Sequence, residues 1–124
     1  SVNGSNLNRV KMDKTTLNQA LVKNAVLDQA RIKFSNCENS NFSGSSFKDV
    51  EINQSNFSRA DLSNCDFSGA KLLESNLQMA KLCGADLSKA SMIDVQLTGA
   101  KYNDETRLPS RIDPKAHNMV YVKQ

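Results

Sequence analysis

His117 and Cys83 are the two side chains of this sequence that could serve as a base or a nucleophile. His117 is the only histidine, so neither a catalytic triad nor a histidine-rich zinc site has the partners that it needs. Cys83 precedes Gly84, and no histidine or basic residue is placed to activate its thiol. The chain also has no glycine-rich phosphate loop and no spacing typical of metal ligands. We therefore predict that the protein is not an enzyme, has no small-molecule substrate, and holds no metal or cofactor.

A basic cluster near the N-terminus is the second feature that could bind a ligand. Residues 1–35 contain six basic and two acidic side chains, which gives this part a net charge of +4. Surfaces that bind single-stranded nucleic acid usually carry exposed aromatic side chains between the charges, and here only Phe34 could play this part. Because most charge runs are solvated faces, we do not expect nucleic acid or an anionic surface to be the partner. The cluster consists of Lys11, Lys14, Arg31 and Lys33.

The elements that must position these residues follow from a repeat of five residues. A large apolar side chain, called the centre here, recurs at every fifth position, and the residue two places before it is small. A period of five suits neither one helix nor one continuous strand, so the chain must turn once in every repeat. The centres are Leu7, Met12, Leu17, Val22, Leu27, Ile32, Cys37, Phe42, Phe47, Ile52, Phe57, Leu62, Phe67, Leu72, Leu77, Leu82, Leu87, Met92, Leu97 and Tyr102.

Four such repeats close a coil of twenty residues, because the small residue and the centre point inward and the last two residues make a corner. The sequence supports this offset, since Ser35, Ser55 and Ser75 are twenty residues apart. Asp66 and Asp86 have the same spacing and should lie about 4.8 Å apart on one face. Such a pair could hold a cation, although Lys48 and Lys89 could instead screen the two charges.

The repeat resembles the pattern of the pentapeptide-repeat family, Ala-(Asp or Asn)-Leu-x-x, over residues 1–104. This resemblance implies an all-β fold, a right-handed quadrilateral β-helix of about five coils. It also implies one alternative function, since some members of the family mimic duplex DNA and protect or regulate DNA gyrase. Such mimicry needs a strongly acidic rod, whereas this chain has a net charge of +3. The motifs that match best are Ala60-Asp61-Leu62, Ser75-Asn76-Leu77 and Ala85-Asp86-Leu87.

The period ends near residue 104, and residues 105–124 are expected to form a C-terminal cap. Asp113 before Pro114 is a typical helix start, which predicts a short helix over residues 114–119. The segment also resembles the C-terminal ends of cyanobacterial and plastid members of the family. We divide the chain into a β-helix at 1–104 and a cap at 105–124. The first coil has no cap, so its open end could join a second copy of the chain.

The columns of the coil separate a predicted core from a predicted binding face. On the fourth side, outward amides could stabilise the stack by bonding one another, or they could form a flat docking surface. Leu73 and Ile93 also point outward and would mark a partner site if the cap leaves them open. The core residues are Phe42, Phe47, Ile52, Phe57, Leu62, Phe67, Leu72, Leu77, Leu82 and Leu87. The candidate binding face is Asn36, Asn56, Asn76, Gln96, Leu73 and Ile93.

These features favour a non-catalytic protein-binding or scaffold module that presents flat faces, with another protein as its partner. With 39% hydrophobic and 6% aromatic residues, the 124-residue chain should form one domain with a thin core. No apolar run is long enough for a membrane span, so we expect a soluble protein. The chain begins without Met and already in phase with the repeat, which suggests processing. The sequence therefore leaves the compartment unknown: either the cytoplasm or, if a targeting segment was removed, the periplasm or thylakoid lumen.

Overall fold

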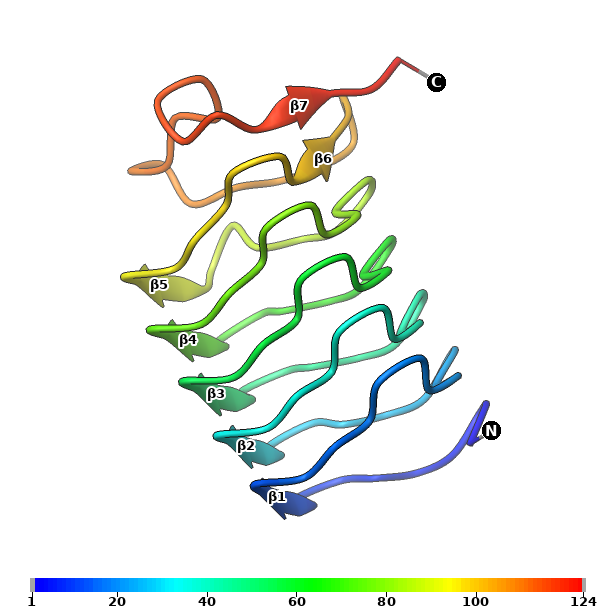
Figure 1. The fold of residues 1–124 in the computed structure, drawn as a ribbon. Helices are drawn as coiled ribbons and strands as arrows, with labels where there is room; N and C mark the ends of the chain where they lie inside the picture. Colours follow the sequence, from blue (N-terminus) through cyan, green and yellow to red (C-terminus); the bar gives the residue numbers. More distant parts are fainter. Residues whose placement is uncertain (1, 124) are drawn as a thin grey trace.

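The computed structural model describes residues 2–123 as a stack of coils with the two chain ends at opposite ends of the stack (Figure 1). Every element is a short β-strand, and the described residues contain no helix. The strands are β1 (Lys11–Asp13), β2 (Arg31–Lys33), β3 (Glu51–Asn53), β4 (Lys71–Leu73), β5 (Ser91–Ile93), β6 (Lys101–Tyr102) and β7 (Val120–Tyr121).

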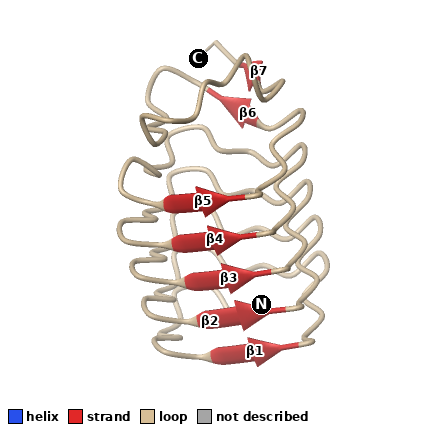
Figure 2. Cartoon of the chain, turned by 90° about the vertical axis from the view of Figure 1, so that its left-hand side faces the viewer, coloured by secondary structure: helices blue, strands red, loops and turns tan. Residues whose placement is uncertain are grey.

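Strands β1 to β5 stack into one parallel sheet along one side of the molecule (Figure 2). Their partners are twenty residues apart, as in Met12 opposite Ile32 and Ile52 opposite Leu72. The other sides stack through single parallel bridges at the same offset, for example Asn56 on Asn76. The predicted coil of twenty residues is confirmed, and the molecule is a parallel β-solenoid of about six turns.

A residue in the left-handed backbone region turns the chain at the corners. Arg9 has a φ of 61°, and residues at the same place in later repeats, such as Asn24 and Asn64, have values close to it. A tight turn closes around the corner, because the Val10 N–H donates to the Leu7 carbonyl at 3.1 Å. The left-handed conformation costs a non-glycine residue about 1 kcal/mol. A hydrogen bond from the corner residue to the next coil offsets this cost, as in Arg9 N–H to the Asp28 carbonyl at 2.9 Å.

The core is a column of centres with small residues beside them. None of the ten residues that the sequence places in the core is more than 4% exposed. Four phenylalanines fill the middle coils, where the rings of Phe47 and Phe67 stack with centroids 4.9 Å apart and planes inclined by 5°. Phe42 lies 5.5 Å from Phe47 and 5.8 Å from Phe57 between ring centroids. These contacts make the middle of the stack the most densely aromatic part of the interior.

The predicted helix over residues 114–119 is wrong, although its start signal acts locally. The Asp113 carboxylate accepts the Lys115 N–H at 3.1 Å, and the Met119 N–H reaches the Pro114 carbonyl at 3.0 Å, which makes a single turn. Asn118 then takes a φ of 57°, which ends the turn. The Val120 N–H donates to the Ala100 carbonyl at 2.8 Å. The chain therefore pairs β7 with the last regular coil and does not extend the turn into a helix.

The C-terminal segment continues the stack with altered spacing. Arg107 bridges Asp86 at an offset of twenty-one residues, whereas Val120 pairs with Lys101 at an offset of nineteen. Three apolar side chains of this segment pack against the core, namely Leu108, Ile112 and Met119. The division of the chain at residue 104 stays a prediction. No helix in residues 2–123 has the length and apolar character to cross a lipid bilayer.

Truncation of a central phenylalanine should cost far more stability than truncation of a leucine at the open end. Phe57 is 1% exposed, whereas Leu7 is only partly buried in the first coil. Phe57→Ala should lower the free energy of unfolding by about 3–5 kcal/mol, as large cavities in packed cores do. Leu7→Ala should lower it by less than half as much, because the first coil has neighbours on one side only. Urea titrations of both variants test this, and equal losses would contradict a stability graded from middle to end.

Candidate functional site

The residues that could do nucleophilic chemistry are not brought together. Burial raises the pKa of the Cys37 and Cys65 thiols to about 12, so both stay protonated at neutral pH. Cys83 is partly exposed and unpaired with another cysteine, and His117 lies in the single C-terminal turn. Among residues 2–123, no three His, Cys, Asp or Glu side chains gather as metal ligands would.

Asp66 and Asp86 stack as their spacing predicts, but each carboxylate has its own hydrogen-bond donors and a nearby cation. Asp66 Oδ1 accepts hydrogen bonds from the Ser68 N–H at 2.9 Å and the Ser68 hydroxyl at 2.6 Å, and its other oxygen lies 3.9 Å from Lys48 Nζ. The two hydrogen bonds from Ser88 hold the pKa of Asp86 below its usual value, with a smaller contribution from the Arg107 charge. The like charges are therefore compensated by local donors and cations, and no third ligand completes a cation site in the described chain.

The amides of the fourth side stabilise corners and do not form a ladder. The Oδ1 atoms of Asn36, Asn56 and Asn76 each accept the backbone N–H two residues further on, at 2.8–3.1 Å. Throughout residues 2–123, no hydrogen bond joins one of these amides to another. The expectation that they bond from coil to coil is therefore not met, because a short side chain next to a turn reaches its own backbone first.

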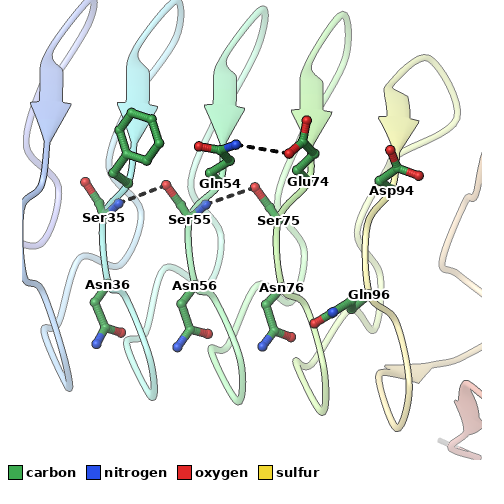
Figure 3. A pocket seen from close by; sticks show the side chains of 11 residues that line it. Ser35, Asn36, Gln54, Ser55, Asn56, Glu74, Ser75, Asn76, Asp94 and Gln96 are labelled. Carbon is green, nitrogen blue, oxygen red and sulfur yellow. Dashed lines mark hydrogen bonds between the residues drawn. The ribbon is translucent and has the colours of Figure 1, made fainter.

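The ladder on this side consists of buried serine hydroxyls, whose positions the repeat pattern marks only as small. The Ser35 N–H donates to Ser55 Oγ at 3.1 Å, and the Ser55 N–H donates to Ser75 Oγ at 3.2 Å (Figure 3). Thr15 N–H joins the same series through Ser35 Oγ at 3.2 Å. The recurrence of serine every twenty residues is the sequence signal that could have predicted this ladder. A small side chain fits these positions, but the hydroxyl is also needed because it accepts the backbone N–H of the preceding coil.

An open groove of about 540 Å³ runs along the corner between the third and fourth sides (Figure 3). One of its walls carries the corner residues of four successive coils, and the other carries the amides of the fourth side. Gln54 Nε2 donates to Glu74 Oε2 at 3.0 Å and joins two of these coils. The groove therefore crosses several coils and presents a different side chain at each. The corner residues are Phe34, Gln54, Glu74 and Asp94.

The two apolar members of the predicted binding face lie beside this groove. Leu73 stacks under Ile93 in the sheet, and Leu73 is half-buried whereas Ile93 is 50% exposed. A second hollow of about 310 Å³ separates Ile93 from Pro109 and Ile112 of the C-terminal segment. This segment therefore leaves Ile93 open, and the fourth side, the groove and Ile93 form one continuous candidate surface, with Gln96 at its C-terminal end.

The basic cluster and the open end of the first coil both lie in the N-terminal part of the stack. Lys11 stacks on Arg31 in neighbouring strands, and no ion pair within residues 2–123 neutralises either of them. The end of the first coil is an apolar hollow of about 300 Å³, where Val2 is 43% and Leu21 is 48% exposed. Self-association through this end stays a prediction.

Loss of one ladder hydroxyl should destabilise the fold more than a charge placed on the amide row. Ser55→Ala removes the acceptor of the buried Ser35 N–H and should cost about 1–3 kcal/mol. Asn56→Asp keeps the turn acceptor, as Asp61 does for the Ser63 N–H at 3.0 Å, and should change stability by less than about 0.5 kcal/mol. Urea titration of both variants gives the change in the free energy of unfolding at each position. A larger decrease for Asn56→Asp than for Ser55→Ala would contradict this prediction and support a structural role for the amide row.

Only one thiol should react in the native protein. With a pKa of about 12, Cys37 and Cys65 are thiolates in roughly one molecule in ten thousand at pH 8, and their burial also excludes reagents. Ellman's reagent should therefore modify Cys83 alone at this pH, and all three thiols after unfolding in urea. Rapid reaction of two or three thiols without denaturant would show that the coils open locally.

Solved structures of known proteins resemble this chain. A pentapeptide repeat protein from the thylakoid lumen of Arabidopsis thaliana is 30% identical, with a TM-score of 0.57, over 91% of this chain and 73% of that one. The pentapeptide repeat protein Rfr23 from the cyanobacterium Cyanothece 51142 is 17% identical, with a TM-score of 0.47, over 86% of this chain and 89% of that one. Curated protein sequences contain no match to the chain.

The family model of pentapeptide repeats matches this chain in eight copies. The matched segments, 12–49, 25–64, 52–88 and 65–101, together cover most of the coils. The repeat of five, the twenty-residue coil and the structural likeness to the lumenal Arabidopsis protein agree with this match. The chain belongs to the pentapeptide-repeat family.

Proposed function

We propose that this protein is a non-catalytic binding module whose partner is another protein, held against the fourth side and its adjoining groove. One observation carries the proposal: the groove and Ile93 form a continuous open surface along one side of the solenoid. Phe34 at one end of it is 53% exposed and Ile93 at the other is 50% exposed. Exposed large apolar side chains next to a groove are typical of protein contact surfaces.

The backbone beneath this surface favours binding without rearrangement. Each coil donates hydrogen bonds to the next, for example from Phe57 N–H to the Asn76 carbonyl at 2.8 Å. A surface that is already ordered loses little conformational entropy when a partner binds, which raises the affinity obtained from a given contact area. The non-catalytic part of the proposal rests on the thiols of Cys37 and Cys65, whose pKa burial raises to about 12.

The charge pattern of the outward columns does not support mimicry of duplex DNA. Asp61 stacks against Lys81, and Asp86 stacks against Arg107. A duplex mimic needs rows of like negative charge that follow the spacing of phosphates, whereas each of these columns contains charges of both signs. The gyrase-directed alternative therefore receives no support from the surface, and the protein-binding module remains the proposal.

Site-specific photo-crosslinking tests which face meets a partner. A photoreactive amino acid replaces Asn56 on the fourth side in one variant and Lys48, next to the opposite second side, in a control. After irradiation in an extract of the source organism, position 56 should give a discrete adduct that position 48 does not. Ile93→Ser added to the first variant should weaken this adduct, because it removes a large apolar side chain from the contact. Equal adducts from both positions, or adducts from position 48 alone, would contradict the assignment of the face.

A further inference from the structure

The corner wall of the groove changes character in a fixed order from coil to coil. It begins with the aromatic ring of Phe34. It continues through the amide of Gln54 to the carboxylates of Glu74 and Asp94 (Figure 3). We propose that the groove binds an extended, basic protein segment in one direction, with an apolar residue at Phe34 and Lys or Arg side chains at the two carboxylates. This inference rests on the proposed function, because it names the chemistry of the partner at the same surface.

The charges of the groove select a cation and disfavour an anion. Its lining contains two carboxylates and no basic side chain. Glu74 accepts one hydrogen bond from Gln54, which holds the carboxylate beside the groove, and its Oε1 atom accepts none from residues 2–123. The Asp94 carboxylate likewise accepts no hydrogen bond within the described chain and is exposed. Both groups therefore keep lone pairs free for a guanidinium or an ammonium group.

Phe34 supplies the second, independent feature of the groove. It occupies a left-handed corner position with a φ of 52°, where its ring points out of the coil and cannot join the core. An exposed ring at the rim of a polar groove can pack an aliphatic side chain or the stem of a Lys or Arg residue. The ring therefore anchors the end of the segment that lies away from the carboxylates.

The opposite wall can bind the backbone of such a segment. The Oδ1 atoms of Asn36, Asn56 and Asn76 are already used by their own turns, which fixes the orientation of each amide. Their Nδ2 groups donate no hydrogen bond within residues 2–123, so they remain as a row of donors. Carbonyl groups of an extended chain are acceptors that these donors can bind, because an extended chain leaves its backbone groups unpaired and exposed.

The coil spacing predicts the spacing of the recognised residues. Stacked strands lie about 4.8 Å apart, so Phe34 and Glu74 are separated by roughly 10 Å and Phe34 and Asp94 by roughly 14 Å along the stack. An extended chain advances about 3.4 Å per residue. Its side chains alternate between two faces, so only residues an even number of positions apart can face the same wall. The segment should therefore carry one basic residue four positions from its apolar residue, opposite Asp94, and a second two positions from it, whose long stem reaches Glu74.

A random peptide library displayed on phage tests the proposal with the full chain as bait. Selected peptides should be enriched in Lys or Arg residues two and four positions from an apolar residue. The best peptide, labelled with a fluorophore, is then titrated by fluorescence anisotropy. The groove variant Glu74→Gln/Asp94→Asn should bind about fivefold or more weakly, since it loses two ion pairs. Phe34→Ser should also bind less tightly.

A matched variant, Asp49→Asn/Glu51→Gln, removes two carboxylates outside the groove and should bind within about twofold of the parent chain. Three results would overturn the proposal: no enriched peptides, enriched peptides without basic residues, or equal losses in the groove variant and the matched variant. None of these results would contradict a protein adduct formed by the photoreactive amino acid at position 56. The failure of this inference and the failure of the proposed function can therefore be told apart.

Discussion

Hydrogen bonds between neighbouring coils are the interaction on which the whole structure depends. The Asn56 N–H donates down the stack to the Ser35 carbonyl at 2.9 Å, and the Phe57 N–H donates up the stack to the Asn76 carbonyl at 2.8 Å. Because successive residues bond in opposite directions, each coil is fixed between two others with a register of twenty. The same register aligns the core, the serine ladder and the corner wall of the groove, so a shift of one residue would lose all three.

The sequence predicts the coil well because its information is periodic and local. Apolar centres such as Phe47 and Phe67 lie twenty residues apart, and a parallel stack is the arrangement that buries every centre at once. The prediction of a C-terminal helix was wrong because the structure there depends on contacts between distant residues. Asp113 and Pro114 signal a helix start, but the pairing of Val120 with Lys101 depends on a coil that local pattern does not describe. Tertiary pairing overrides local propensity there.

The candidate site was only partly readable from the sequence. Asn56 and Ser55 both recur at intervals of twenty, so periodicity alone gives them equal weight. Their roles differ because the Ser55 hydroxyl is buried and accepts a hydrogen bond from the preceding coil, whereas Asn56 bonds the backbone of its own turn. The groove was missed since its wall is made of corner positions, which share no residue type. Only stacking shows that Phe34 and Glu74 line one surface.

A stack of identical coils is in principle a template for unlimited end-to-end growth, because each exposed coil edge can accept another coil of the same register. The sixth turn breaks this template. Arg107 sits twenty-one residues after Asp86, whereas Val120 sits nineteen after Lys101. A regular coil placed on this end would match one side and miss the other. The C-terminal turn thus presents an edge that is out of register with a further regular coil, which disfavours end-to-end stacking at this end.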